Sequence, residues 1–380
     1  VLYSRAYSSH PICVPARMAL LTGMNAVKNG VLDNGQSLRP DHQRCGIDTW
    51  PETLSENGYY TIAVGKMHFC PWEARLGFRH RIIAEDKIWI HIQDDYHHFL
   101  KAHGYEKTVG YDKEAYHENF GAYISDIPWE YSVDHFVGRE AARWIGEYDG
   151  EEPFAMMVGF PGPHHPYDPT PEYAAQFDPE DMPEPLPQVE EDVALLEKAF
   201  GRSLTNLSSS SWYAFKNQRE PERKDFMLQR ARYTALIKQI DHEVGAILEA
   251  LREVPLLVRV PWAESSTDYQ GLVSLKDVTA TILSLAGCEV PAYMDSIPLP
   301  ELGLPVDEPR NRVAGMLRQG WMLVRDEWKL AKYGGGGSLL FNLEEDPLEQ
   351  QNLLREDGYE EIAAQMDAEL TKVIMQSINI

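Results

Sequence analysis

A cysteine and an arginine four residues apart begin the most informative stretch of the chain. Residues 13–17 read Cys-Val-Pro-Ala-Arg, and the apolar residues that follow predict a helix ending near Gly23. A nucleophile at the start of a helix lies beside free backbone amides and the positive end of the helix dipole. Because residues four apart share a helical face, Arg17 can hold an anion that Cys13 attacks. A buried structural cysteine beside a surface arginine explains this pattern equally well, since free cysteine is among the most buried residue types.

A lysine and a histidine two residues apart follow the next recognisable element. Residues 59–64 are rich in β-formers and predict a strand, and residues 65–68 read Gly-Lys-Met-His. On a strand, residues two apart lie on one face, so Lys66 and His68 can both face one anion. Histidine is suited to proton transfer near neutral pH. Taken alone, the pair is more simply explained as solvated surface residues.

A second histidine lies where a parallel strand ends. The apolar run 154–160 predicts a buried parallel strand, and it leads into Pro163-His164-His165-Pro166. Open α/β sheets bind ligands at the carboxyl ends of such strands, so His164 is a candidate to contact substrate. A histidine that only closes the loop is the alternative. Asn34, in the turn after Gly30, is a further candidate contact, although asparagine is also a common turn residue.

Together these strings resemble the signatures of the type I sulfatases of the alkaline-phosphatase superfamily. The matching strings are Cys-x-Pro-x-Arg with Leu-Thr-Gly at 21–23, Gly-Tyr-x-Thr at 58–61 with Gly-Lys-x-His at 65–68, and Pro-His-x-Pro at 163–166. Further likeness at 275–283 and 340–353 extends the resemblance to nearly the whole chain. It implies that a formylglycine-generating enzyme oxidises Cys13 to formylglycine. One hydroxyl of the hydrated aldehyde then attacks sulfur, and the second releases sulfate.

The resemblance also implies a role for each candidate residue. Arg17 and a divalent cation hold the nucleophile, and Lys66 contacts both the nucleophile and the sulfate. His68 helps to release sulfate, and His164 stabilises the leaving oxygen. Asn34 resembles an asparagine that contacts the sulfuryl group in some relatives. Related phosphonate monoester hydrolases typically carry Tyr and Thr in place of the Lys/His pair, so this pair favours sulfate over phosphonate.

The family's cation is most often Ca²⁺, with Mg²⁺ and Mn²⁺ as alternatives, and Cys13 as formylglycine would be one of its ligands. The carboxylates that complete such a site are absent from the printed sequence. The predicted helix 225–253 runs directly into a predicted strand at 254–260 without a turn residue, which indicates a missing segment between Glu253 and Val254. We expect another before Val1. The cluster at 94–98 (Asp94, Asp95, His97 and His98) is more simply a solvated helical face, so we assign it no metal.

Composition limits the partners. The chain of 380 residues has 35 Lys and Arg against 59 Asp and Glu, a net charge of −24. This argues against nucleic acid or an anionic membrane as partner, although a basic pocket for a small anion remains compatible with it. No run of 18 apolar residues is present. Four scattered cysteines without a CxxC pair and the absence of a signal-peptide pattern favour a reduced, cytoplasmic setting. The oligomeric state cannot be read from the sequence.

The predicted elements indicate an α/β protein. Helices are predicted at 53–57, 132–148, 225–253, 277–286 and 360–377, and strands at 59–64, 154–160, 322–332 and 339–343. The segment 82–131 is read as insertions and short helices. Together with the resemblance, this predicts a large mixed sheet sandwiched by helices, as in alkaline phosphatase, with a small α+β C-terminal subdomain. We expect a catalytic domain at 1–290 and a subdomain at 291–380 with a hairpin around the 334–337 turn and a terminal helix.

The expected activity is hydrolysis of a small-molecule sulfate ester, either an aryl sulfate or a small organic sulfate. A phosphonate monoester or phosphodiester hydrolase of the same superfamily is the enzymatic alternative, because sulfate and phosphate esters share tetrahedral geometry. A non-catalytic relative that only binds anions is the alternative from another class. The aromatic segment 85–135 is expected to line the mouth of the pocket.

Overall fold

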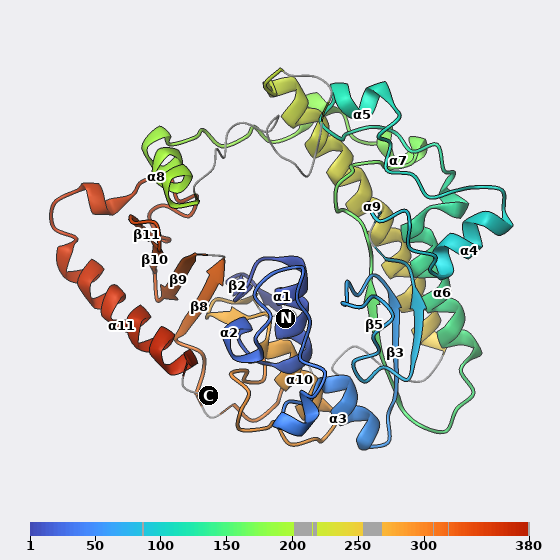
Figure 1. The fold of residues 1–380 in the computed structure, drawn as a ribbon, viewed down its shortest axis with the longest axis horizontal. Helices are drawn as coiled ribbons and strands as arrows, with labels where there is room; N and C mark the ends of the chain where they lie inside the picture. The colour runs from blue at the N-terminus through green and yellow to red at the C-terminus, as the bar shows by residue number, and fades with distance from the viewer. Residues whose placement is uncertain are drawn as a thin grey trace.

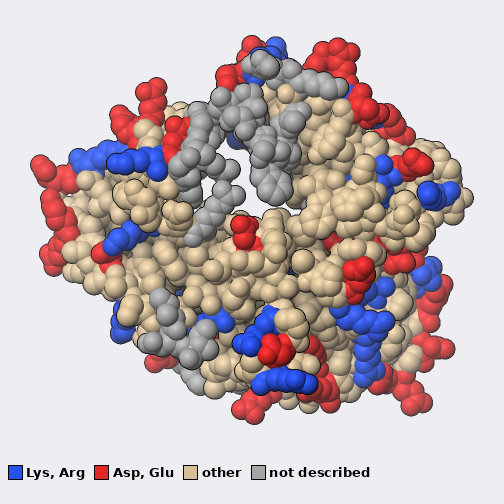
Figure 2. Space-filling view, viewed as in Figure 1, with Lys and Arg blue, Asp and Glu red and all other residues tan. Residues whose placement is uncertain are grey.

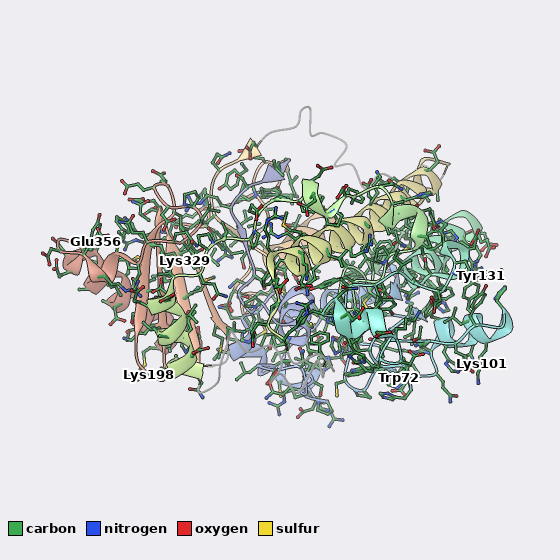
Figure 3. The ribbon with its side chains drawn as sticks, turned by 90° about the horizontal axis from the view of Figure 1, so that it is seen from above. Trp72, Lys101, Tyr131, Lys198, Lys329 and Glu356 are labelled. Carbon is green, nitrogen blue, oxygen red and sulfur yellow. The ribbon has the colours of Figure 1, made fainter. Side chains whose placement is uncertain are left out.

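The computed structural model describes all residues except 86, 201–214, 216–218, 254–267, 307, 318 and 379–380. In Figure 1, the parallel strands β3 and β5 lie with α6 and α9 on one side of the molecule, and an antiparallel sheet with α11 lies on the other. The N-terminal helix α1 lies between them. The side view in Figure 3 shows Lys198 and Lys329 at one end of the molecule and Lys101 and Tyr131 at the opposite end.

A three-stranded parallel sheet supports the site. Its order is β4-β3-β5, with β3 (Tyr60–Gly65) in the middle, β4 (His80–Ile83) on one side and β5 (Phe154–Gly159) on the other. The register pairs Gly65 with both Ile83 and Gly159. The parallel direction predicted for 154–160 is therefore confirmed. The prediction that this strand is buried is wrong: β5 is half-buried throughout, because among the described strands it has β3 alone as a neighbour.

Helices cover both faces of this sheet. Side chains alternate along β3, so Ile62 and Val64 pack under α6 (Val133–Glu147), while Ala63 packs with α1 (Cys13–Thr22), α3 (Trp50–Glu56) and α10 (Asp277–Leu285). Helix α9 (Arg223–Glu253) lies along α6. The predicted helix–sheet–helix arrangement is thus confirmed.

Two further pairs of parallel strands bring residues 2–7 beside residues 268–274. β1 (Leu2–Tyr3) pairs with β6 (Asp268–Tyr269), and β2 (Ala6–Tyr7) pairs with β7 (Val273–Ser274). The described strands of the predicted large sheet therefore form one group of three and two pairs. The abrupt Glu253–Val254 junction and the strand predicted at 254–260 involve residues outside the described part of the chain.

The C-terminal region is an antiparallel sheet with a helix across it. The order is β11-β10-β9-β8, and α11 (Glu360–Ile378) packs through Met366 and Leu370 against Leu323, Leu330 and Leu340. The single strand predicted at 322–332 is wrong. A turn at residues 326–327, with the first in the left-handed region, divides it into two strands. The four strands are β8 (Arg312–Leu317), β9 (Gly320–Arg325), β10 (Trp328–Tyr333) and β11 (Ser338–Asn342).

Helix α8 (Glu190–Phe200) packs against this C-terminal sheet although it lies far earlier in the chain. Leu195 and Leu196 contact the cluster of Ala331, Leu339 and Phe341. The segment 82–131 contains short helices, as predicted, and Tyr96 of α4 is buried against α6. No described helix combines the length and the apolarity needed to cross a bilayer. The remaining short elements are α2 (Ala26–Asn29), η1 (Gln43–Cys45), α4 (Asp95–Ala102), α5 (Glu114–Glu118), η2 (Trp129–Tyr131), α7 (Pro171–Ala174), η3 (Pro179–Asp181) and η5 (Leu353–Arg355).

The close approach of β3 and β5 gives a test of this fold. Gly65 has φ +91°, and a Cβ there would lie 2.2 Å from the carbonyl oxygen of Gly159. We expect Gly65→Ala to lower the free energy of unfolding by both backbone strain and this clash. Gly58→Ala is the matched control, because Gly58 has φ +84° but open space around its Cβ position.

Gly58→Ala is expected to lower the free energy of unfolding by about 1–2 kcal/mol through backbone strain alone. Gly65→Ala should lower it by about 1–3 kcal/mol more, because its Cβ also overpacks the contact with β5. Urea unfolding of the two variants and the parent measures the difference. Equal losses for the two variants would contradict the close β3–β5 contact.

Candidate active site

Cys13 is the first residue of α1, at the end where the helix amides are free. The N-cap, Ile12, provides no side-chain hydrogen bond to the helix. The amide of Val14 instead donates to Oδ1 of Asn34 at 3.0 Å. Asn34 therefore lies beside Cys13, and the carbonyl oxygen of its side chain holds the first turn of α1. Only its amide group is left to face a ligand.

Arg17 and Lys66 connect α1 to the end of β3. Nη1 of Arg17 donates to the backbone oxygen of Lys66 at 2.9 Å, and the amide of Lys66 donates to the oxygen of Gly159 at 2.7 Å. Lys66 is 3% exposed, so it is not the solvated surface residue that the sequence alone favoured. This arrangement brings the first two predicted strings into one site.

His68 is held in an uncommon backbone conformation by a buried carboxylate. Its φ is +56°, and its amide donates to Oε2 of Glu85 at 3.0 Å. Arg81 pairs with the other oxygen of Glu85 at 3.2 Å, and the ring of Trp89 meets the His68 ring edge-on. Burial raises the pKa of Glu85, and Arg81 opposes that rise. Sequence reasoning missed Glu85, because it acts through a backbone amide 17 residues away.

His164 lies in the cleft, and its ring is fixed by its own loop. Nδ1 is 2.6 Å from the backbone oxygen of His165, so Nδ1 carries the proton of that hydrogen bond and Nε2 is the nitrogen left for the cleft. His165 also contributes to the cleft lining, but it is largely buried, with its ring packed against Tyr116 and close to Gly121. The assignment of the Pro-His-x-Pro histidine to position 164 thus agrees with the geometry.

The surrounding cations and histidines strongly favour the Cys13 thiolate. Hydrogen bonding from His164 is the largest cause, followed by His68, and with Lys66 they lower the pKa of the Cys13 thiol to about 5 against the opposing effect of burial. Neither ring nitrogen of His68 has a partner at standard hydrogen-bond distance among the described residues. We therefore treat its effect on Cys13 as electrostatic and longer in range. The site is a local region of positive potential.

The described lining of the cleft differs in charge from the rest of this acidic chain. On the face shown in Figure 2, Asp and Glu side chains lie mostly at the periphery. The cleft has a volume of about 770 Å³, and its described lining contains no carboxylate. Apart from the catalytic candidates, much of the lining is apolar or aromatic. It is formed by Ser8, Pro11, Ile12, Cys13, Ala16, Arg17, Leu20, Lys66, Met157, Phe160, Pro161, Gly162, Pro163, His164, His165, Tyr167, Tyr233 and Leu275.

The aromatic surface of the cleft comes from elements other than those predicted. Tyr233 of α9 and Tyr167 after β5 line it, with ring centroids 6.1 Å apart. The described lining includes no residue of the segment 85–135. Tyr96 is in the core under α6, and Trp89 contacts His68 from behind. The expectation that this segment lines the mouth is therefore wrong for the described cleft.

The described residues do not fit a divalent cation at Cys13. They contain no group of three or more His, Cys, Asp or Glu side chains that could hold a metal. In the cluster at 94–98, Asp95 and His98 are exposed, as expected of a solvated helical face, whereas Asp94 is not. Asp94 is 2% exposed, accepts from the amide of His97 at 2.9 Å and pairs with Lys107 at 2.6 Å. It is a buried helix cap rather than part of a solvated face.

A family model described as Sulfatase matches residues 1–254. The arylsulfatase of Clostridium perfringens (strain 13 / Type A) is 23% identical over 428 aligned positions, covering 94% of this chain and 84% of that protein. Because 428 exceeds the 380 residues of this chain, that protein has stretches without a counterpart here. The choline-sulfatase of Rhizobium meliloti (strain 1021) is 24% identical, covering 91% of this chain and 74% of that protein.

Solved structures show the same fold. The phosphonate monoester hydrolase of Agrobacterium radiobacter has a TM-score of 0.79 at 18% identity, covering 99% of this chain and 88% of that one. A protein solved in complex with its substrate D-glucosamine-2-N,6-O-disulfate has a TM-score of 0.68 at 16% identity, covering 99% and 90%.

The chain therefore has the alkaline-phosphatase-like α/β fold of these structures, with Cys13 at a helix N-terminus in a cleft that Lys66 and His164 also line. Within that fold class, the family model covers two thirds of the sequence. The chain belongs to the sulfatase family and is a sulfuric ester hydrolase.

The thiol environment makes a direct prediction for protein whose Cys13 has not been converted. A lowered pKa means that the thiolate is present above the folded pKa, so alkylation of Cys13 by iodoacetamide should be half-maximal near pH 5, the pKa given by its surroundings. The exposed Cys45 and Cys70 in the same protein serve as internal reference thiols outside the cleft. Peptide mass spectrometry after timed alkylation at each pH measures all three.

His164→Gln should move the Cys13 midpoint upward, because it removes the largest cause of the lowered pKa. A Cys13 midpoint that coincides with those of Cys45 and Cys70 would contradict the described site.

Proposed function

We propose that the protein hydrolyses an aryl or small organic sulfate ester, with formylglycine derived from Cys13 as the nucleophile. The observation that carries this proposal is the position of Cys13, at the free end of α1 and facing Lys66, His68 and His164. The family supports hydrolysis of a sulfate ester. The apolar and aromatic lining of the cleft is suited to an organic group attached to the sulfate.

The residues around Cys13 have distinct tasks in this reaction. Once Cys13 is converted, the hydrated aldehyde supplies one hydroxyl for attack on sulfur and a second through which sulfate is released. The Lys66 ammonium stabilises the charge that develops on the sulfuryl oxygens. Arg17 keeps the end of β3 fixed against α1 and adds positive charge beside the nucleophile. Overall, the sulfate ester anion and one water give an alcohol, a sulfate dianion and one proton.

The two histidines move the protons. Nδ1 of His164 is bound to a backbone oxygen, so the protonated ring donates from Nε2 to the leaving oxygen as the S–O bond breaks. His68 accepts a proton from the hydrate when sulfate is released. The family implies a divalent cation, with Ca²⁺ first and Mg²⁺ or Mn²⁺ as alternatives. No step is assigned to it here, because the described residues do not provide its ligands.

The deciding experiment combines mass and activity. The full chain is co-expressed with a formylglycine-generating enzyme, and the tryptic peptide 6–17 is weighed. We expect a peptide lighter than the encoded one by the change from thiol to aldehyde. An aryl sulfate and an aryl phosphonate monoester are then assayed in parallel at several concentrations of Ca²⁺, with Cys13→Ala as the inactive control and Cys45→Ser as the matched active one.

A larger kcat/KM for the sulfate is expected from the Lys66 and His68 pair. A larger value for the phosphonate would make the protein a phosphonate hydrolase. Converted protein that cleaves neither ester would support the anion-binding alternative, and a thiol that persists during co-expression would refute the proposed nucleophile.

A single charge removal tests the sulfuryl contact. Lys66→Ala should lower kcat/KM for the aryl sulfate by about 10²–10³-fold, the usual cost of losing one group that stabilises developing negative charge. Lys101→Ala removes an exposed lysine of α4, at the end of the molecule shown in Figure 3, and should leave the rate unchanged. Steady-state kinetics of both variants gives the comparison, and a Lys66→Ala rate equal to that of Lys101→Ala would contradict the assigned contact.

A further inference from the structure

A buried carboxylate lies directly behind the loop that carries His164. Asp134 is the second residue of α6 and is 2% exposed. Its Oδ1 accepts a hydrogen bond from the amide of Gly162 at 2.9 Å. Gly162 is two residues before His164, and the amide of His164 returns to the oxygen of Pro161 at 3.3 Å. The turn from 161 to 164 is therefore fixed to α6 at one point.

The contact between Asp134 and Gly162 is tight. A Cβ at Gly162 would lie 2.5 Å from Oδ2 of Asp134 and 3.0 Å from its Cγ. The carboxylate thus contacts the α-carbon of Gly162 as well as its amide. Any larger residue at 162 would push the turn away from α6.

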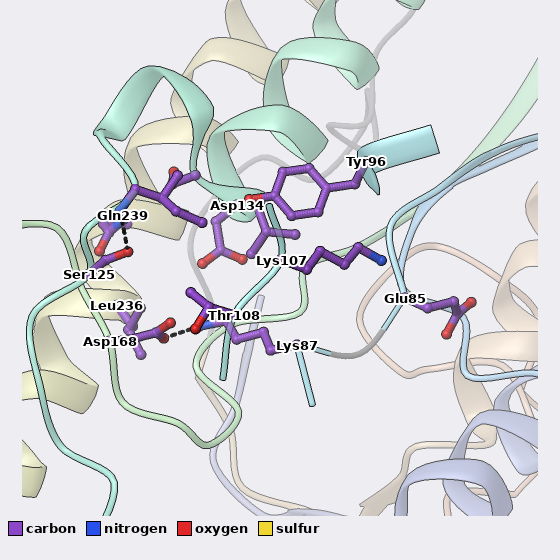
Figure 4. Close-up of a pocket in the computed structure, with 13 residues that line it drawn as sticks. Glu85, Lys87, Tyr96, Lys107, Thr108, Ser125, Asp134, Asp168, Leu236 and Gln239 are labelled. Atoms are coloured by element: carbon purple, nitrogen blue, oxygen red, sulfur yellow. Dashed lines mark hydrogen bonds and ion pairs between the residues drawn. The ribbon is translucent and has the colours of Figure 1, made fainter. Parts of the chain in front are cut away.

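The surroundings of Asp134 keep its side chain in place. It lines a small pocket of about 40 Å³ together with Lys87 and Asp168, which pair at 2.7 Å (Figure 4). Burial raises the pKa of Asp134, while the Lys87 ammonium and the Gly162 amide oppose that rise. Helix α6 is itself held against α9, where Gly138 allows a close approach to Glu243 and His135 bonds that carboxylate at 2.9 Å. The support for Asp134 is rigid.

We propose that Asp134 is a positioning residue for His164: by holding the amide of Gly162, it keeps Nε2 of His164 at the leaving oxygen of the ester. This inference rests on the proposed function, in which His164 donates the proton to that oxygen. Asp134 is not among the described residues that line the cleft. Its effect is transmitted through the backbone of residues 162–164.

Proton donation matters most when the leaving alcohol is a weak acid, so the test uses a series of aryl sulfates whose phenols differ in pKa. Asp134→Ala removes the acceptor for Gly162 and should lower kcat/KM by about 10²-fold for the poorest leaving groups, the order of loss for a misplacement of about 1 Å. It should change the rate little for the best leaving group. Asp134→Asn keeps an oxygen acceptor of the same shape and should retain most of the activity.

His164→Ala should give the same steep dependence on the leaving group. Combining it with Asp134→Ala should steepen the dependence no further, because both changes remove one function. The proposal would be overturned if Asp134→Ala lowered kcat/KM equally for all aryl sulfates of the series. It would also be overturned if the double variant depended more steeply on the leaving group than either single variant.

A second readout does not depend on sulfatase activity. In unconverted protein, His164 is the largest cause of the low Cys13 pKa, so Asp134→Ala should raise the pH midpoint of Cys13 alkylation above about 5. Asp126→Ala, which removes an exposed aspartate, is the control and should leave the midpoint unchanged. An unchanged midpoint in Asp134→Ala would contradict the positioning role even if the parent protein cleaves no sulfate ester.

If Asp134→Ala fails to fold, Gly162→Ala displaces the same turn from the loop side and leaves α6 intact. It should reproduce both the steeper leaving-group dependence and the raised midpoint. A folded Gly162→Ala variant would refute the proposal if its leaving-group dependence and its Cys13 alkylation midpoint equalled those of the parent protein. Failure of the proposed function is recognised separately, as absence of aryl sulfate cleavage by converted parent protein.

Discussion

The close contact between the ends of β3 and β5 is the constraint on which the site depends. A Cβ at Gly65 would lie 2.2 Å from the oxygen of Gly159, and a Cβ at Gly159 would lie 2.2 Å from the oxygen of Lys66. Two glycines therefore allow the strands to remain paired up to the point where both leave the sheet. Beyond that point, the segment after β3 carries Lys66 and His68, and the segment after β5 carries His164. Arg17 then fixes α1, and with it Cys13, to the same point through the Lys66 oxygen.

The charge of the site is opposite to that of the whole molecule. The chain carries a net charge of −24, yet the described lining of the cleft combines Arg17, Lys66 and His164 without a carboxylate. The carboxylates that support the site are buried behind it: Glu85 holds the His68 backbone, and Asp134 holds the Gly162 backbone. Each accepts a hydrogen bond from a loop amide, so it orders that loop without placing negative charge where an anionic substrate binds.

The sequence predicts best those site residues that lie close together along the chain and next to a helix or strand. Such residues are found at 13–17, at 66–68 and at His164, and residue spacing and periodicity together locate them. Their meeting in one site followed from resemblance, not from periodicity. Asn34 was found beside Cys13, but its hydrogen bond to the Val14 amide is a backbone contact that no pattern in the sequence reveals.

Glu85 and Asp134 escaped prediction for the same reason, because an acceptor for a distant amide has no required spacing. The division of the predicted strand 322–332 was also missed. The turn there is made by Asp326 in the left-handed region rather than by glycine, so apolar residues continue on both sides of it without a clear break.

The pairing of the first strands also affects the order of events during synthesis. β1 and β2 lie immediately before Cys13, and their partners β6 and β7 are more than 260 residues later. At translation rates of 5–20 residues per second, the first strands wait roughly 10–50 s for those partners to be made. During that interval the segment around Cys13 has not acquired its native pairing, and the thiol is not yet enclosed by Lys66 and His164. The topology thus leaves a period on the ribosome in which the Cys13 segment is accessible before the fold closes around it.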